Sequence, residues 1–361
     1  MFWIHGGNFR YGSSAQVTYT GTPLAKRGNI VLITINYRLG PLGFLYIPGK
    51  TANVGMLDQV AALKWVHDNI EAFGGDPNNV TIFGESAGAA SVITLLTMPA
   101  AKSLFHRAIA QSTPFYYDSY QETGSKKFIS RLRVDPEDIE SLQKIDIKKI
   151  NRIHYKMAIE GYATQETTPF TPVVDGKILP EDPLKVLNNG YAEDIPLLIG
   201  TNRDEIKFYH ALLPNLPELD SKQLLNRTNR IINNLGHNED KAKRLIENYK
   251  EAREGKLPTD PQEILDAIIT DVMFRIITIR IAEAQRKHQP NTYTYMFTWP
   301  SPMMGGKLGV PHAIEVAFVF GTLYIPGTEK YCGKGKDAEI LRQQRFSISD
   351  CVSYCEVVYS W

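Results

Sequence analysis

The feature that most constrains the fold of this chain is the pentapeptide Gly84–Gly88, which has the pattern Gly-X-Ser-X-Gly. Before it stands Thr81–Phe83, a β-branched and aromatic run typical of a buried strand. After it, small residues lead into Ser91–Leu96, a predicted helix. A serine on such a sharp turn has a strained backbone, and glycines at its flanks give it room. The pattern predicts a nucleophilic Ser86 at a helix N-terminus; the alternative is a turn of small residues that serves packing alone.

A second glycine-rich turn follows the first predicted strand. His5–Gly7 comes directly after the apolar residues Phe2–Ile4. Paired glycines let backbone N–H groups approach a ligand closely. A His-Gly-Gly loop is a known partner of the serine turn, because it supplies N–H donors to an oxyanion. An ordinary tight turn is the alternative for this segment.

Strand-like and helix-like segments alternate in the first third of the chain. Asn29–Arg38 is almost continuously apolar, as in a parallel strand that is covered on both faces. Leu39–Phe44 is predicted to be a loop from its Gly and Pro content. Val54–Phe73 has apolar residues near the helical period, and Leu104–Ser112 is the next predicted strand. This order predicts an α/β fold with a mostly parallel central sheet flanked by helices.

The rest of the chain is richer in charged helical patterns. Pro261–Lys287 is predicted to be one long buried helix, and Tyr293–Trp299 the last clear strand. We expect one domain over residues 1–361, with cap-like helical excursions near 114–190 and 206–290. Helices packed over the carboxyl edge of the sheet would cover the place where an α/β enzyme keeps its site.

Composition excludes several classes of function. The formal net charge is +1, which indicates neither a nucleic acid nor an anionic membrane as partner. No apolar run approaches the roughly 18 residues of a membrane span. The three cysteines (Cys332, Cys351 and Cys355) are too few and too clustered for a disulfide framework, and no Cys/His metal spacing occurs. We therefore expect no cofactor and no metal. No signal peptide is visible, which favours a cytoplasmic location, although Met1–Gly7 has the pattern of a strand interior and not of a natural start.

A nucleophilic serine needs a histidine as its base and a carboxylate to orient that base. In α/β-hydrolases the chain order is serine, acid, histidine. Of the eight histidines, His312 alone lies in a Gly/Pro loop directly after a predicted strand. The others precede the acid, follow it too closely or stand in charged helical surroundings. His312 is therefore the predicted base; the alternative is a histidine of a surface loop.

The acid is not fixed by these arguments. Asp204 and Glu205 both follow the short predicted strand Ile195–Gly200. Asp175 and Asp271 are more distant competitors. Either Asp or Glu can do this chemistry.

Taken together, these segments resemble the type-B carboxylesterase family, which includes bacterial p-nitrobenzyl esterases and, more distantly, the cholinesterases. The resemblance covers most of residues 1–321 in one order. It rests on Trp3–Gly7, Asn36–Gly40, Ala72–Pro77, Gly84–Gly88, Gly200–Glu205 and His312 followed by Phe318–Gly321.

The resemblance implies an α/β-hydrolase fold and assigns roles to residues. It places the acid at Glu205 and makes Asp204 a neighbouring structural acid. It implies an oxyanion hole formed by the N–H groups of Gly7, Asn8 and Ala87. Further residues that it places around the site are Gly6, Glu85, Ser112 and Asp271.

The sequence departs from the family pattern in three respects. Ile206 stands where relatives have glycine after the acid pair. Relatives have more chain before the first strand and after Phe318–Gly321, and Phe346–Trp361 keeps a hint of the helix expected there. We therefore expect a chain that is truncated at both ends or built as a reduced version of the family. An uncovered sheet edge would favour aggregation.

The predicted function is that of a serine hydrolase. It would cleave carboxylic esters with short to medium acyl or aryl groups through an acyl-enzyme on Ser86, so its expected partner is a small-molecule ester. The alternatives are a catalytically silent, cholinesterase-like binding or adhesion module and an inactive truncated homologue. The oligomeric state is not predicted by the sequence.

Overall fold

The computed structural model describes residues 1–114, 120–164, 170–211, 218–233, 236 and 238–344. It divides into two compact units. The first unit is Met1–Ile199 with Arg280–Tyr293, and the second is Gly200–Ile279 with Thr294–Trp361. The expectation of a single domain over 1–361 stays a prediction.

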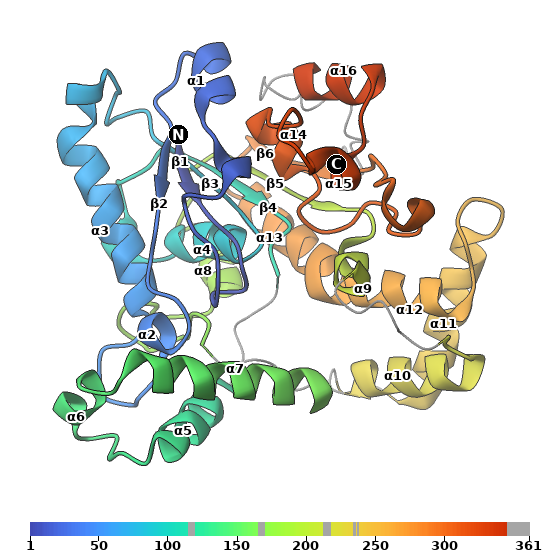
Figure 1. Ribbon diagram of the computed structural model, residues 1–361, viewed down its shortest axis with the longest axis horizontal. Coiled ribbons are helices and arrows are strands. Elements are labelled where there is room, and N and C mark those ends of the chain that lie inside the picture. Colours follow the sequence, from blue (N-terminus) through green and yellow to red (C-terminus); the bar gives the residue numbers. More distant parts are fainter. Residues whose placement is uncertain (115–119, 165–169, 212–217, 234–235, 237, 345–361) are drawn as a thin grey trace. The chain divides into compact units, whose positions relative to one another are not determined.

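A parallel sheet forms the core of the first unit (Figure 1). In this sheet β1 pairs with β2 and β3, and β3 pairs with β4. The register sets Ile4 opposite Ile35 on one side and opposite Gly84 on the other. The strand order is β2-β1-β3-β4-β5-β6. The strands are β1 Phe2–Ile4, β2 Ile33–Ile35, β3 Thr81–Glu85, β4 Arg107–Gln111, β5 Leu197–Asn202 and β6 Thr292–Phe297.

The apolar runs become strands because both faces of the sheet are covered. Every residue of β1 and β3 is buried, as expected for central parallel strands. Helix α4 (Ala87–Leu95) is also buried throughout. Its first four residues are Ala or Gly, so the helix can pack closely on β1 and β3. This packing fixes where the turn at Ser86 lies.

The first helical excursion consists of α5 (Tyr120–Leu132), α6 (Ile139–Gln143) and α7 (Ile147–Thr164). Figure 1 shows these three helices as one group in green. A Cβ at Gly40, in the segment after β2, would lie 2.7 Å from the imidazole of His154 on α7. The group therefore packs near the segment that follows the carboxyl end of β2.

Three local predictions differ from the structure. The predicted loop Leu39–Phe44 contains the short helix α2 (Pro41–Phe44), with a proline at its first position, where a missing N–H costs nothing. The long helix predicted over Pro261–Lys287 is interrupted by η5 (Asp271–Arg275), a turn of π-helix between α12 (Pro261–Thr270) and α13 (Ile276–Arg286). Strand β2 is also shorter than its apolar run.

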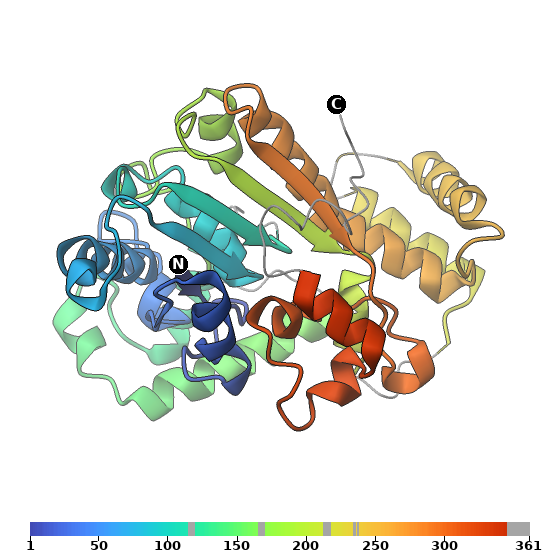
Figure 2. The same ribbon diagram turned by 90° about the horizontal axis from the view of Figure 1, so that it is seen from above.

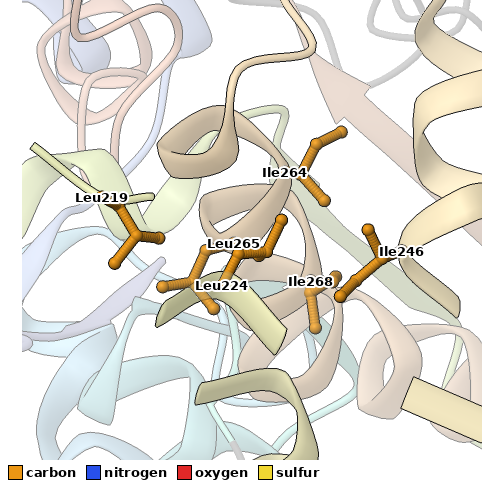
Figure 3. Packing of buried hydrophobic residues seen from close by; sticks show 6 residues of the cluster. All are labelled: Leu219, Leu224, Ile246, Ile264, Leu265 and Ile268. Atoms are coloured by element: carbon orange, nitrogen blue, oxygen red, sulfur yellow. The ribbon is translucent and has the colours of Figure 1, made fainter. Parts of the chain in front are cut away.

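In the second unit, α12 packs against α10 (Ser221–Asn233) and α11 (Glu239–Arg253). These helices are drawn in yellow and pale orange in Figure 2. Their core is an apolar cluster shown in Figure 3: Leu219, Leu224, Ile246, Ile264, Leu265 and Ile268. The cluster holds α12, and with it the start of η5, in place.

The remaining elements are the 16-residue helix α3 and a set of shorter helices. They are η1 Val17–Tyr19, α1 Thr22–Gly28, α3 Val54–Asn69, η2 Ile70–Phe73, η3 Pro99–Ala101, α8 Pro183–Asn188, η4 Glu205–Lys207, α9 Phe208–Ala211, η6 Met303–Gly306, α14 Val316–Phe320, α15 Thr328–Cys332 and α16 Lys336–Gln344. The helix hint over Phe346–Trp361, with Cys351 and Cys355, lies outside the described residues. No helix in the described part of the chain combines the length and the apolarity that a membrane span needs.

Candidate active site

Ser86 occupies the turn between β3 and α4, as predicted. Its backbone has φ 58° and ψ −123°, a conformation that L-residues rarely adopt. Two backbone hydrogen bonds hold it: the Ser86 N–H donates to Gln111 O at 2.9 Å, and Ser86 O accepts from the Ala90 N–H at 2.9 Å. The sheet and the helix together therefore impose the strained turn that presents the hydroxyl.

The two glycines of the pattern are required by close backbone approach. A Cβ at Gly84 would lie 2.5 Å from the carbonyl carbon of Gly88 and 2.8 Å from Ile4 O. A Cβ at Gly88 would collide with Ile4 O. The turn thus packs directly on the end of β1, where no side chain fits.

The loop after β1 lies against the same turn. A Cβ at Gly6 would lie 2.8 Å from Glu85 O and 3.1 Å from Ser86 Cβ. Gly7 has φ +109° and its carbonyl accepts the N–H groups of Arg10 and Tyr11 at 3.0 and 3.1 Å, which makes a tight turn. The His-Gly-Gly segment therefore runs beside Ser86, with Asn8 directly after it.

The N–H groups available in this unit suit an oxyanion. Ala87 is the first residue of α4, so its N–H has no acceptor within the helix. Asn8 has φ 56°, so the loop turns sharply just after the glycines. A helix N-terminus beside a glycine turn is an arrangement that binds anions.

Glu85 and Ser112 lie close to the turn in sequence and in space. The Glu85 side chain is buried and faces the Gly6 backbone, because a Cβ at Gly6 would lie 2.9 Å from Glu85 Oε2. Burial and the charge of Glu85 raise the pKa of Tyr11. Ser112 is fully buried with φ 56°, directly after Gln111, whose carbonyl holds Ser86.

In the second unit the structure brings Glu205 and His312 together. His312 Nδ1 lies 2.7 Å from Glu205 Oε2, and both side chains are buried. Because a carboxylate accepts and cannot donate, the imidazole carries its proton on Nδ1 in this contact. The His312 N–H also donates to Glu205 O at 3.2 Å. Nε2 is thereby left as the nitrogen that can accept a proton.

Asp204, the other acid of the pair, contacts a different part of the histidine loop. Its Oδ2 accepts the Val310 N–H at 2.8 Å and Arg203 Nε at 2.9 Å, while its own N–H donates to Val310 O at 2.9 Å. A Cβ at Gly309 would collide with the same carboxylate. Asp204 therefore shapes the loop that carries His312 through the backbone of Val310.

Asp271 is linked to the Glu205–His312 pair through Arg275. It is hydrogen-bonded to Tyr249 and paired with Arg275 across the η5 turn. Arg275 Nη2 donates to Arg203 O at 2.7 Å, just before the acid pair. Phe274 of the same turn lies 5.0 Å from the His312 ring, centroid to centroid. The π-helical turn thus supports the Glu205–His312 pair, in keeping with the frequent use of such turns at functional sites.

Sequence reasoning missed three residues beside this pair. Tyr331 OH donates to His312 O at 2.5 Å. Asn202 and Glu315 hydrogen-bond each other beneath the loop, and both are fully buried. Burial, with a smaller contribution from the Glu205 charge, raises the pKa of Glu315. A buried Asn at the end of a strand has no signature in a sequence. Glu315 could have been suggested from the sequence, because its carboxyl follows the predicted base His312 by three residues.

The candidate residues thus form two groups, one in each unit. Ser86, Gly6 and Glu85 lie together in the first, with the N–H groups of the adjoining loop and helix. Glu205 and His312 form a hydrogen-bonded pair in the second. Within the described ranges, no cluster of three His, Cys, Asp or Glu side chains could hold a metal ion. These groups offer a hydroxyl on a strained backbone turn, N–H donors for an oxyanion, and an imidazole whose proton is held on Nδ1.

A parallel sheet with a serine on the β3–α4 turn, an acid after β5 and a histidine after β6 defines an α/β-hydrolase. The model of the carboxylesterase family matches residues 1–345, and the chain belongs to that family. It is 36% identical over 329 residues to the para-nitrobenzyl esterase of Bacillus subtilis (strain 168), covering 90% of this chain and 64% of that protein.

Other relatives give the same result. A phenmedipham hydrolase of Pseudarthrobacter oxydans is 34% identical over 90% of this chain and 63% of its own length. Among solved structures, a thermophilic PNB esterase superposes with a TM-score of 0.81 at 33% identity, over 97% of this chain and 70% of the other. The predicted α/β-hydrolase fold and family are confirmed. The chain spans less than two thirds of the length of these two curated relatives.

Proposed function

We propose that this chain is a serine-dependent carboxylic ester hydrolase. Ser86 attacks the ester carbonyl, and His312 Nε2 takes its proton while Glu205 holds the ring through Nδ1. The N–H groups of Gly7, Asn8 and Ala87 stabilise the oxyanion; each such donor is typically worth about 3 kcal/mol of the barrier. His312 then protonates the leaving alcohol, and water cleaves the acyl-enzyme.

The observation that carries the proposal is the buried 2.7 Å hydrogen bond between Glu205 and His312. A histidine of a surface loop would not have its Nδ1 proton fixed by a buried carboxylate. The contact therefore favours His312 as a general base over His312 as a surface-loop residue. Family membership and the φ of 58° at Ser86 support the same chemistry.

Aryl and short to medium acyl esters are the proposed substrates. The relative named para-nitrobenzyl esterase supports a substrate with an aromatic group. We also propose that residues 1–361 act as one catalytic domain, with cap-like excursions near 114–190 and 206–290. The silent binding module is disfavoured because Ser86, Glu205 and His312 are all present.

The test is hydrolysis of p-nitrophenyl butyrate by the chain and by its Ser86→Ala variant, with thermal unfolding of both. We expect activity in the first and none above background in the second, with similar cooperative transitions. Equal rates in both would reject Ser86 as nucleophile. No activity in a cooperatively folded chain would support the silent or truncated alternative.

A further inference from the structure

Asn202 is the last residue of β5 and is fully buried. Its backbone N–H donates to Glu205 Oε1 at 2.6 Å, opposite the oxygen that faces His312. Its carbonyl accepts from Arg275 Nη2 at 3.3 Å. The main chain of Asn202 therefore holds the acid, whatever side chain the residue carries.

The side chain of Asn202 contacts other residues than its main chain does. Its Nδ2 donates to Pro311 O at 2.9 Å and to Glu315 Oε2 at 2.6 Å. Pro311 immediately precedes His312, and Glu315 follows it by three residues at the start of α14. Both hydrogens of one amide thus tie the end of β5 to the chain on either side of the histidine.

The neutral amide suits this place. Glu205 and Glu315 are both fully buried, so a cation at position 202 would compete with the imidazole for Glu205. The hydrogen bond from Asn202 opposes the rise in the pKa of Glu315 that its burial causes. An amide satisfies that carboxyl and the Pro311 carbonyl without adding a charge next to His312.

We propose that Asn202 is a positioning residue, whose side chain sets the alignment of the His312 imidazole with the Glu205 carboxylate by holding Pro311 and Glu315. This inference rests on the proposed function. The loop has other attachments, at Val310 to Asp204 and at the His312 N–H to Glu205 O. Loss of the Asn202 side chain should therefore leave the loop in place and loosen the imidazole.

The main variant is Asn202→Leu, which is close in size and removes both side-chain hydrogen bonds. Displacement of a catalytic group by about 1 Å costs on the order of 100-fold, so we expect kcat on p-nitrophenyl butyrate to fall about 10- to 100-fold. The backbone hydrogen bond to Glu205 is kept. KM should stay within about twofold, because the side chain does not contact the substrate in the proposed mechanism.

Gln285→Leu is the matched control. Gln285 is also a buried amide, and its Nε2 donates to two carbonyls, Ala192 O and Ile195 O, both at 2.8 Å. It lies in the first unit, in α13, and contacts no residue of the Glu205–His312 pair among these bonds. We expect a comparable fall in Tm with kcat within about twofold of the wild type, since the same chemical loss occurs away from His312.

The pH profile separates positioning from mere stability. In the described part of this unit, the titratable groups with a contact or an electrostatic interaction to His312 include Glu205, Glu315, Tyr209 and Tyr331. A nearby carboxylate favours the charged imidazole, so a looser Glu205 contact lowers the pKa of the base. In Asn202→Leu the acid limb of kcat/KM should move to lower pH by about half a unit. A smaller folded fraction would leave that limb unmoved.

Asn202→Ser provides a second variant if the leucine prevents folding, because serine is small and lacks the reach to Pro311. It should show the same loss of kcat and the same shift of the acid limb. Wild-type kcat and an unmoved limb in a folded Asn202 variant would overturn the inference, as would an equal loss in Gln285→Leu. Lack of Ser86-dependent activity in the wild type would instead reject the proposed function, so the two failures are distinguishable.

Discussion

Replacing Glu205 with glutamine exchanges one carboxylate oxygen for an NH₂ group at nearly constant shape. Glu205 Oε1 accepts the Asn202 N–H at 2.6 Å, and Oε2 faces His312 Nδ1 at 2.7 Å. A backbone N–H can only donate, so the glutamine oxygen must remain opposite Asn202. The introduced NH₂ group therefore faces His312.

The histidine must then accept at Nδ1, which moves the ring proton to Nε2. An imidazole with that tautomer cannot take a proton from Ser86. The corresponding exchange of the acid for its amide in a serine protease triad lowers kcat by about 10⁴, because the histidine takes the wrong tautomer. At about 1.4 kcal/mol per factor of ten, this is about 5.5 kcal/mol of transition-state stabilisation. Because both hydrogen bonds can still form, the free energy of unfolding should change by no more than about 1.5 kcal/mol.

The assay is kcat on p-nitrophenyl butyrate together with Tm. Glu263→Gln is the control, since its carboxylate pairs with Lys207 and Arg253 in the same unit but does not contact His312 in these pairs. We expect it to lower Tm and leave kcat within about threefold. A Glu205→Gln variant that keeps the wild-type Tm and loses less than about tenfold in kcat would refute the reasoning.

Three further predictions concern pH and packing. Hydrolysis should fall below roughly pH 6 to 7 as His312 becomes protonated, and a pH–rate profile that stays flat to about pH 4 would exclude His312 as the base. Burial raises the pKa of Asp266 to about 7, above its unfolded value, so its contribution to stability is present below about pH 4 and is lost as pH rises to about 7. Asp266→Asn should flatten this fall of up to about 4 kcal/mol in urea titrations at several pH values, and an unchanged slope would contradict it. Gly88→Ala should lower the free energy of unfolding by about 3 kcal/mol or more, because its Cβ would collide with Ile4 O; an unchanged Tm would show that β1 can move away.

The sequence predicted the sheet and the turn at Ser86 well, because both depend on local patterns. Runs of β-branched residues mark strands buried on both faces, and the glycines at 84 and 88 are dictated by a close approach that no other residue allows. Helix α2 was missed because its four residues, rich in Gly and Pro, have a loop composition. The π-helical turn was missed because it holds one more residue than an α-helical turn. In a helix that is apolar on all sides, this extra residue does not change the sequence pattern.

The acid could not be chosen from local sequence alone. Asp204 and Glu205 are adjacent, follow the same strand and differ by one methylene. Their side chains leave a tight turn in different directions, so one meets the Val310 N–H and the other the imidazole. The resemblance to a family selected Glu205; its catalytic role, like that of Ser86, stays a prediction.

The donors that surround these acids explain why the second unit suits a histidine base. Glu205 is satisfied by a backbone N–H and by His312, and Glu315 by the amide of Asn202. The donors in these three hydrogen bonds are a backbone N–H, an imidazole and an amide, and none is a lysine or an arginine. These hydrogen bonds therefore leave Glu205 its negative charge. When Ser86 loses its proton in the proposed reaction, the imidazolium forms beside that carboxylate in a buried environment, where fixed charges act strongly. The arrangement therefore favours the transition state, in which the imidazole gains a positive charge beside the Glu205 carboxylate, over the resting state, in which the imidazole is neutral. This is what a general base requires.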